Sequence, residues 1–464
     1  MKQKAMNSHR CLYLRLALTL LIPAMLPGCV GNRPYRLQGI ADEIYEKKFP
    51  GQKPPNEVGE AGDRHYHLSF VEFDEKGDFW DRAQLAKAAV RIRNSPRPVL
   101  LVVFIHGWHH NAADRSENTK NPGDVQTFRC LLSQLAVSAS AHDLDVHGVY
   151  LGWRGRLFQG PLDYVTFLDR KGAAARVAGT PVTETIFELI RQARKRSATA
   201  SKTVVVGHSF GALVLEKAMA QAIAGSVLAQ DTQARGGTFN APADLILLVN
   251  SAAESIYAKE LDDMFRAIRH RGQINSDRPL LVSLTSVSDT ATKGWFPVGA
   301  FPPNLFARRH YDWGERRGPS SDNVSQHEYL TTTPGHNRRL FTHEIVRLGS
   351  DPKATTSTPF DIRQPGACVR ANPAFEENLQ NPQGMIFATS VRANPEQLVW
   401  WRIRPLSTDK RNLTPYWVMH VPDEIIHEHS PIFTPEGRAL MAAIFRITNP
   451  KSQPGPRQMS ISSE

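Results

Sequence analysis

Cysteine is scarce in this chain, with 4 residues among 464, and no cysteine–histidine spacing of the kind that binds structural zinc occurs. We therefore expect no metal site and no cofactor. Basic residues exceed acidic ones, with a net charge of +11, but they form no continuous stripe, which argues against nucleic-acid binding. Internal repeats are also missing. With 41% hydrophobic and 22% charged residues, the composition is that of an ordinary globular protein.

A long uninterrupted apolar run is missing as well. The apolar stretch from Leu12 to Leu26 follows a Lys/Arg-rich start, is broken by Pro23 and is followed by Pro27. It is too short and too interrupted for a membrane span. These features predict a secretory signal peptide over residues 1–28.

The end of this signal carries a further pattern. Leu26-Pro27-Gly28-Cys29 resembles the lipobox of bacterial lipoproteins, in which cleavage before the cysteine accompanies lipidation of its thiol. The resemblance implies lipidation of Cys29, which would attach the protein to a membrane of the bacterial cell envelope. Val30 stands where an aspartate would indicate retention in the inner membrane, which favours the outer membrane. Ordinary secretion, with Cys29 as a spare thiol, is the alternative.

Two cysteines remain in the folded part of the chain, Cys130 and Cys368. Whether they pair is open, because a disulfide needs a specific geometry that the sequence does not fix. Cys130 lies in the apolar segment Phe128-Arg129-Cys130-Leu131-Leu132, which predicts a small core residue.

Composition and periodicity divide the mature chain into five regions. A stretch rich in glycine, proline and charge predicts a flexible tether, and a proline-rich stretch with few periodic segments predicts an inserted cap or wrapping segment. In order, we expect a tether at 29–64, the first part of an α/β core at 65–289, the insert at 290–415, the last core strand, base loop and helix at 416–448, and a disordered tail at 449–464.

The core region alternates strands with helices. Residues 67–73 alternate in polarity like an antiparallel edge strand, whereas 99–105 form a continuous apolar run, typical of a parallel strand buried on both faces. The other expected elements are strands at 146–153, 203–206, 245–249, 280–285 and 416–421, and helices at 124–137, 182–194, 260–270 and 436–446. This alternation predicts a mainly parallel sheet with helices on both faces.

One strand-to-helix junction carries a candidate nucleophile. Gly207-His208-Ser209-Phe210-Gly211 follows an apolar strand and precedes an apolar helix, so Ser209 lies at a sharp turn with a glycine two residues to either side. The glycines remove Cβ atoms that would collide as the strand and helix close up, and the turn exposes the serine hydroxyl.

A serine hydroxyl is a weak nucleophile and needs a base, a group that orients the base, and donors for the oxyanion that forms. The first buried strand ends in Ile105-His106-Gly107-Trp108, where glycine allows close approach of the backbone. We expect the amides of Trp108 and Phe210 to form the oxyanion hole. For His106 we expect a structural role, bracing this loop by hydrogen bonds.

The acid and the base are expected at the carboxyl ends of later strands. Asp289 follows one such strand and is the preferred acid, and Glu254 follows the preceding strand as the alternative. Two histidines, His427 and His429, lie in a loop after the last strand, and only one of them can face Ser209. Either choice gives the chain order serine, acid, histidine that α/β-hydrolases use.

Together these motifs resemble the α/β-hydrolase superfamily, specifically its serine esterases and lipases with a histidine–glycine oxyanion loop. The resemblance covers roughly residues 95–290 and 415–447. It favours His429 as the base, since that histidine is followed by a small polar residue and then by Ile432 and Phe433. It implies hydrolysis of a small-molecule or lipid carboxylic ester through an acyl-enzyme.

Two other functions stay open from sequence alone. One is a non-catalytic envelope lipoprotein that uses the hydrolase fold for binding or scaffolding, because fold does not guarantee function. The other is an acyltransferase, which differs only in what attacks the acyl-enzyme. Protein partners are unknown.

The insert contains two histidine-bearing segments, Thr331-Thr332-Thr333-Pro334-Gly335-His336 and Leu340-Phe341-Thr342-His343. Two histidines seven residues apart are weak evidence for a metal site. We expect them to form hydrogen bonds within loops.

Overall fold

The structure is a computed structural model, and it describes most of the chain from Gly31 onward. The described residues are 31–36, 54–113, 123–139, 143–158, 163, 166–231, 241–269, 278–296, 326–355, 385–391, 394–407, 413–430 and 433–448. The predicted signal peptide, Cys29, Cys368 and the C-terminal tail lie outside them.

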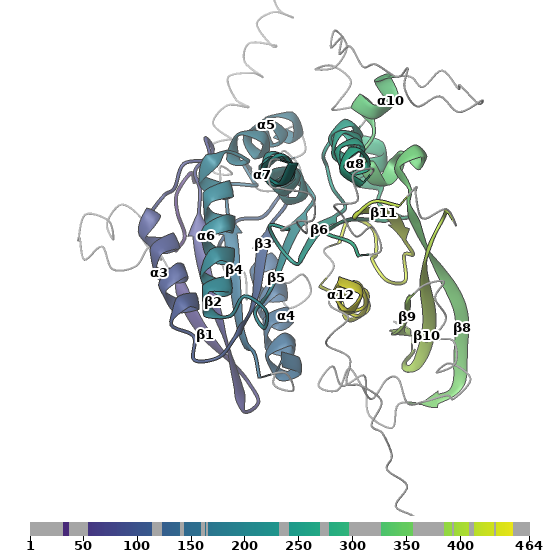
Figure 1. The fold of residues 1–464 in the computed structure, drawn as a ribbon, viewed down its shortest axis with the longest axis horizontal. Coiled ribbons are helices and arrows are strands. Elements are labelled where there is room, and N and C mark those ends of the chain that lie inside the picture. The colour runs from purple at the N-terminus through teal and green to yellow at the C-terminus, as the bar shows by residue number, and fades with distance from the viewer. Residues whose placement is uncertain are drawn as a thin grey trace, which may run out of the picture.

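An eight-stranded sheet runs through the centre of the molecule (Figure 1). Its strands lie in the order β1-β2-β4-β3-β5-β6-β7-β11, and all neighbours are parallel except β1 and β2. The strands are β1 (Asn56–Ala61), β2 (Arg64–Glu72), β3 (Val99–Ile105), β4 (Asp145–Gly152), β5 (Lys202–His208), β6 (Leu245–Val249), β7 (Leu281–Ser286) and β11 (Tyr416–Val421). The predicted α/β class with a mainly parallel sheet is confirmed.

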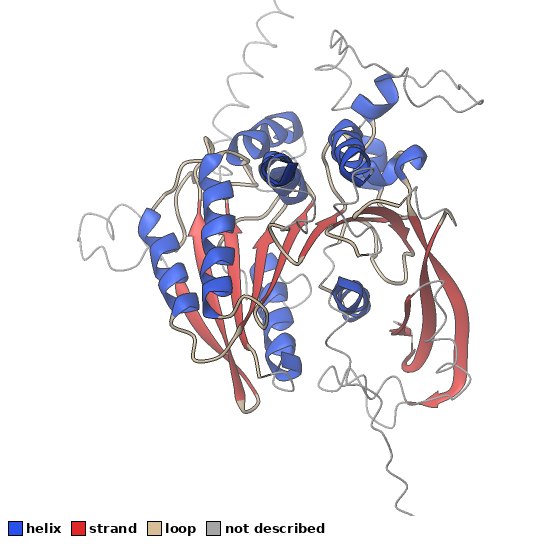
Figure 2. Ribbon diagram, viewed as in Figure 1, coloured by secondary structure: helices blue, strands red, loops and turns tan. Residues whose placement is uncertain are grey.

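Helices cover both faces of the sheet (Figure 2). One face packs against α3 (Arg82–Arg93), α5 (Phe167–Val177), α6 (Thr180–Arg196), α7 (Phe210–Asp231) and α8 (Ser255–Arg269). The other packs against α4 (Asp124–Ala139) and α12 (Pro435–Thr448). Every residue of β3, β4, β6 and β7 is buried, and for β3 the continuous apolar run predicted this burial.

The predicted insert contains regular structure that its sequence did not indicate. It holds a second, antiparallel sheet in the order β8-β10-β9, made of β8 (His343–Thr355), β9 (Met385–Val391) and β10 (Asn394–Pro405). Between β7 and β8 lie the short helices η4 (Ala291–Trp295), α10 (Gln326–Thr331), η6 (Pro334–His336) and η7 (Arg338–Leu340). The small sheet packs beside α12, and Thr342, just before β8, bonds to Val418 of β11. These parts therefore wrap the outer edge of the main sheet.

Two local expectations are wrong. Residues 67–73 are not at the sheet edge, because β2 lies between β1 and β4, and β1 itself comes from the stretch predicted to be a tether. Cys130 is not a core residue: α4 presents it to solvent, while Phe128 and Leu132 of the same helix are buried. Among the described residues, no helix is long and apolar enough to span a membrane.

The N-terminal segment at residues 31–36 is also packed rather than flexible. The backbone amides of Tyr35 and Arg36 donate to the carboxylate of Glu72, at 2.9 and 2.8 Å. Arg36 is fully buried; its guanidinium lies 3.8 Å from the ring of Phe70, and its Nε donates to the carbonyl of Ala112. Burial raises the pKa of Glu72 to about 7, against the opposing effect of these amides. A buried carboxylate needs hydrogen-bond donors, and here the donors are backbone amides of the N-terminal segment. The prediction of a flexible tether is therefore wrong for residues 31–36.

The packing of Arg36 makes a testable prediction. Arg36→Ala should lower the free energy of unfolding by about 2–4 kcal/mol, since it leaves the Glu57 carboxylate without this ion pair and the Ala112 carbonyl without this donor. Urea unfolding measures the change. The matched control is Arg33→Ala, an exposed arginine of the same segment, which should change stability by less than about 0.5 kcal/mol. Equal effects of the two substitutions would contradict the packing.

Candidate active site

The turn between β5 and α7 has the strained geometry that its sequence predicted. Ser209 has a φ of 56°, in the left-handed region that a non-glycine residue rarely adopts. A Cβ on Gly211 would lie 2.2 Å from the carbonyl oxygen of Ile105, and one on Gly207 would lie 2.7 Å from Cα of Ala212. Both glycines are therefore required by close contact, one with the end of β3 and one with the start of α7.

Ser209 lies at one end of a chain of hydrogen bonds. Its Oγ is 2.7 Å from Nε2 of His429, and Nδ1 of His429 is 2.9 and 3.0 Å from the two carboxylate oxygens of Asp289. Asp289 is completely buried and Ser209 is 5% exposed, whereas the His429 side chain is 28% exposed. Three residues from distant parts of the sequence thus meet at the carboxyl ends of β5, β7 and β11.

The charge on Asp289 decides which nitrogen of His429 carries the proton. Burial acts to raise the pKa of Asp289, but hydrogen bonds from His429 and from Thr292 together hold the pKa below its usual value. An ionised carboxylate only accepts, so Nδ1 of His429 must donate to it. With that proton on Nδ1, Nε2 is left to accept the hydroxyl proton of Ser209, the arrangement required of a base.

Two buried side chains fix the loop that carries His429. His208 lies directly before Ser209, and its Nε2 donates to the carbonyl of His429 at 3.0 Å. Asn250, directly after β6, donates to the carbonyls of Glu428 and Ser430 at 3.2 and 3.1 Å. Three consecutive carbonyls of the loop are therefore held by residues at two strand ends.

The alternative acid and base have other partners. The His427 side chain is 47% exposed, and its Nδ1 lies 2.9 Å from both carboxylate oxygens of Asp423. Glu254 pairs with Lys171 of α5, with 2.8 Å between Nζ and Oε1. Of the two candidate pairs, the structure brings together Asp289 and His429 with Ser209.

The loop after β3 lies against the nucleophile. A Cβ on Gly107 would be 2.7 Å from Cβ of Ser209, so no side chain fits at this position. The side chains of Trp108 and Phe210 lie 6.1 Å apart between ring centroids, and Phe167 packs against both. The side chains of the two residues expected to supply oxyanion donors therefore pack together, next to the contact between Gly107 and Ser209.

His106 braces this loop, as its position suggested. Its Nε2 accepts from the backbone amide of Trp153 at 3.0 Å, and its carbonyl accepts from the Trp153 indole at the same distance. The ring is stacked between Tyr150 and Trp153. Burial lowers the pKa of His106 to about 4, so the ring is neutral and structural at physiological pH.

Sequence reasoning missed the residues that support the catalytic candidates. His208 and Asn250 had a usable signal, because each is a polar residue at the carboxyl end of a buried parallel strand, where ligands and active sites gather. Thr292 had no such sequence signal, because it contacts Asp289 only through the turn of the chain into η4 directly after the acid.

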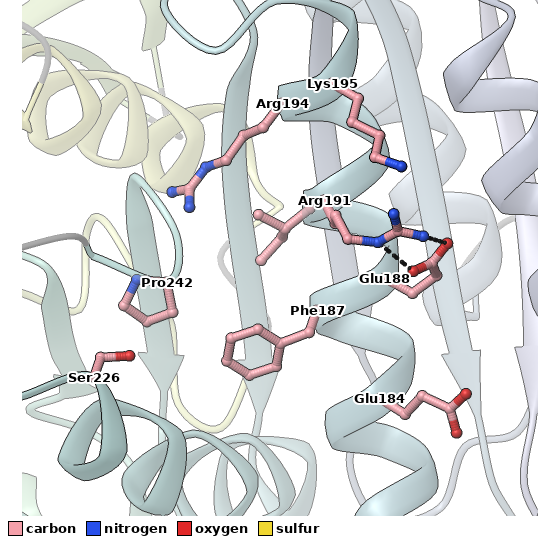
Figure 3. Close-up of a pocket in the computed structure, with 9 residues that line it drawn as sticks. Glu184, Phe187, Glu188, Arg191, Arg194, Lys195, Ser226 and Pro242 are labelled. Atoms are coloured by element: carbon pink, nitrogen blue, oxygen red, sulfur yellow. Dashed lines mark hydrogen bonds and ion pairs between the residues drawn. The ribbon is translucent and has the colours of Figure 1, made fainter. Parts of the chain in front are cut away.

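A surface groove elsewhere on the protein is separate from this site (Figure 3). It lies between α6 and α7 and is lined by Phe187, Arg191, Arg194, Ser226 and Pro242, with Arg191 bonded to Glu188. Pro242 precedes β6, so the groove lies toward the amino ends of the strands, whereas Ser209 lies at the carboxyl end of β5.

Within the described part of the chain, no group of three or more His, Cys, Asp or Glu side chains is placed to bind a metal ion. No family model, curated protein or solved structure matches this chain. Its function has to be inferred from the residues themselves.

The contact at Gly107 is testable by a pair of glycine substitutions. Gly107→Ala should destabilise the protein by about 1–3 kcal/mol, because the new methyl group would overlap Ser209 and the carbonyl of His208. Gly225→Ala, in the exposed part of α7 with nothing near its Cβ position, should instead stabilise by about 0.5–1 kcal/mol. Thermal unfolding of both variants checks the difference, and an unchanged Gly107→Ala protein would contradict the contact.

Proposed function

We propose that this protein is a serine hydrolase that cleaves carboxylic esters through an acyl-enzyme. The observation that carries the proposal is the continuous hydrogen-bonded chain from Ser209 through His429 to the buried carboxylate of Asp289. The hydrogen bonds connect nucleophile, base and acid in that order, and His429 carries its proton on Nδ1, as this chemistry requires.

In the proposed mechanism, His429 takes the proton of Ser209 as Oγ attacks the ester carbonyl. Asp289 stabilises the imidazolium that forms, and His429 then returns the proton to the departing alcohol. Water attacks the resulting acyl-enzyme with the same base and restores Ser209. The developing oxyanion is held by the amides of Trp108 and Phe210, and losing one such donor typically costs about 10²–10³ in rate.

The fold supports the same proposal. We infer an α/β-hydrolase fold from three features: the mainly parallel sheet with β3 and β4 exchanged in order, the left-handed serine between β5 and α7, and acid and base loops after β7 and β11. The wrapping sheet β8-β10-β9 lies between the acid and the base in sequence.

For location, we propose a lipid anchor at Cys29 in the bacterial outer membrane, as the lipobox resemblance implies. Only five residues lie between Cys29 and Tyr35, a reach of at most about 22 Å. The hydroxyl of Tyr35 is 3.5 Å from the side-chain amide of Asn111, in the loop that follows Trp108. An anchored protein would therefore hold its active-site loop near the membrane, which favours lipid esters among the possible substrates.

A covalent probe tests the nucleophile. A fluorophosphonate should label the wild-type protein at Ser209, and Ser209→Ala should remove both the label and ester hydrolysis, because no other group takes the place of Oγ. Mass spectrometry locates the label. Full esterase activity in Ser209→Ala would overturn the mechanism. Unlabelled, inactive wild-type protein would favour a binding module, and acyl transfer to added alcohols would indicate an acyltransferase.

The two loop histidines provide a matched pair. His429→Ala should reduce kcat by about 10²–10⁴, the usual contribution of a general base. His427→Ala removes a histidine two residues away whose partner is Asp423, and should leave kcat nearly unchanged. Steady-state kinetics on a soluble ester compare them. A larger loss in His427→Ala than in His429→Ala would reverse the assignment.

A further inference from the structure

The wrapping segment returns to the active site behind the acid. Thr292 lies three residues after Asp289, in η4, and is 3% exposed. Its backbone amide donates to one carboxylate oxygen of Asp289 at 3.1 Å, and its hydroxyl donates to the other. Among the described residues, Thr292 alone binds the Asp289 carboxylate besides His429.

The Thr292 hydroxyl has a second partner from farther along the chain. Nε2 of His336 lies 2.9 Å from Oγ1 of Thr292. A hydroxyl has one proton, and here it is given to an ionised carboxylate, so the histidine must be the donor in this pair. Burial lowers the pKa of His336 to about 4, so the ring is neutral, and its donation to Thr292 places its one proton on Nε2.

The turn that carries His336 is rigidly placed. A Cβ on Gly335 would lie 1.9 Å from Oγ1 of Thr285 in β7, so the turn packs directly on the strand that leads to Asp289. On its other side, the fully buried Asn337 donates to the hydroxyl of Ser255 at 3.1 Å, at the start of α8. The segment Thr331 to His336, expected to form loop hydrogen bonds, thus reaches the acid of the candidate triad.

We propose that Thr292 and His336 are positioning residues: His336 donates to Thr292, Thr292 donates to Asp289, and the carboxylate is thereby held at the angle at which it orients His429. This inference rests on the proposed hydrolase function of Ser209. A donor that is itself bonded as an acceptor becomes a stronger donor, so His336 acts on Asp289 through Thr292. The wrapping segment then contributes to catalysis without contacting the substrate.

The test uses isosteric and conservative variants of the full chain. Thr292→Val should lower kcat about ten-fold with KM unchanged, because it removes a hydrogen bond to a charged group, and Thr292→Ser should restore most of the loss. His336→Leu should lower kcat several-fold, and His336→Gln, which keeps an N–H near the position of Nε2, should restore it. The double variant Thr292→Val with His336→Leu should be no slower than Thr292→Val alone.

Thr333→Val is the matched control. Thr333 is fully buried in the same segment, and its hydroxyl has no hydrogen-bond partner among the described residues. The substitution should leave kcat unchanged. Equal losses in Thr333→Val and Thr292→Val would mean that the segment matters only for stability, and would overturn the proposal, as would additive losses in the double variant.

A spectroscopic readout separates this inference from the proposed function. In protein labelled with ¹⁵N-histidine, the proton on Nδ1 of His429 reports its bond to Asp289 without any turnover. Thr292→Val should shift this resonance, and Thr333→Val should not. If the wild-type protein neither hydrolyses esters nor reacts with the fluorophosphonate, the proposed function fails. The resonance still tests whether Thr292 acts on the bond between Asp289 and His429. An unshifted resonance in Thr292→Val overturns the positioning role of Thr292 and His336.

Discussion

The carbonyl groups of the loop at Glu428, His429 and Ser430 are bound by His208 and Asn250, and the geometry of the candidate site depends on these bonds. The loop follows β11, which is separated from β5 by β6 and β7 in the sheet, and it comes after the long wrapping segment in the sequence. Backbone carbonyls held at three consecutive positions leave the ring of His429 few orientations. Because His208 precedes Ser209 directly, one turn of chain both presents the nucleophile and fixes its base.

Much of this arrangement was predictable from local sequence. A continuous apolar run predicted β3, shorter apolar segments predicted β6 and β7, and the glycines around Ser209 predicted the tight turn, because burial and close contact leave a direct signature in residue type. Asp289 and His429 were predictable as residues after strands, since parallel strands bring their carboxyl ends together. The sequence did not decide between His427 and His429 without the family resemblance; a hydrogen bond of 2.7 Å to Ser209 does.

Other parts depend on contacts that have no local signature. β1 pairs along β2 although its sequence is rich in glycine and charge, and residues 31–36 are ordered by the buried carboxylate of Glu72, which lies 36 residues from Arg36. The strands of the small sheet pack beside α12 through Phe387, Val399 and Trp401, a contact that depends on a helix from the far end of the chain. In each case, contacts with residues distant in sequence determine the structure, and the local composition does not reveal it.

The burial of Arg36 also has a mechanical consequence. A force applied to the chain upstream of Gly31 enters the folded part at Tyr35 and Arg36, whose bonds lead to Glu72 in β2 and to Ala112 in the loop beyond Trp108. Because Arg36 also pairs with Glu57 of β1, pulling on the N-terminus loads the edge of the active site and the edge of the sheet together, through one buried arginine.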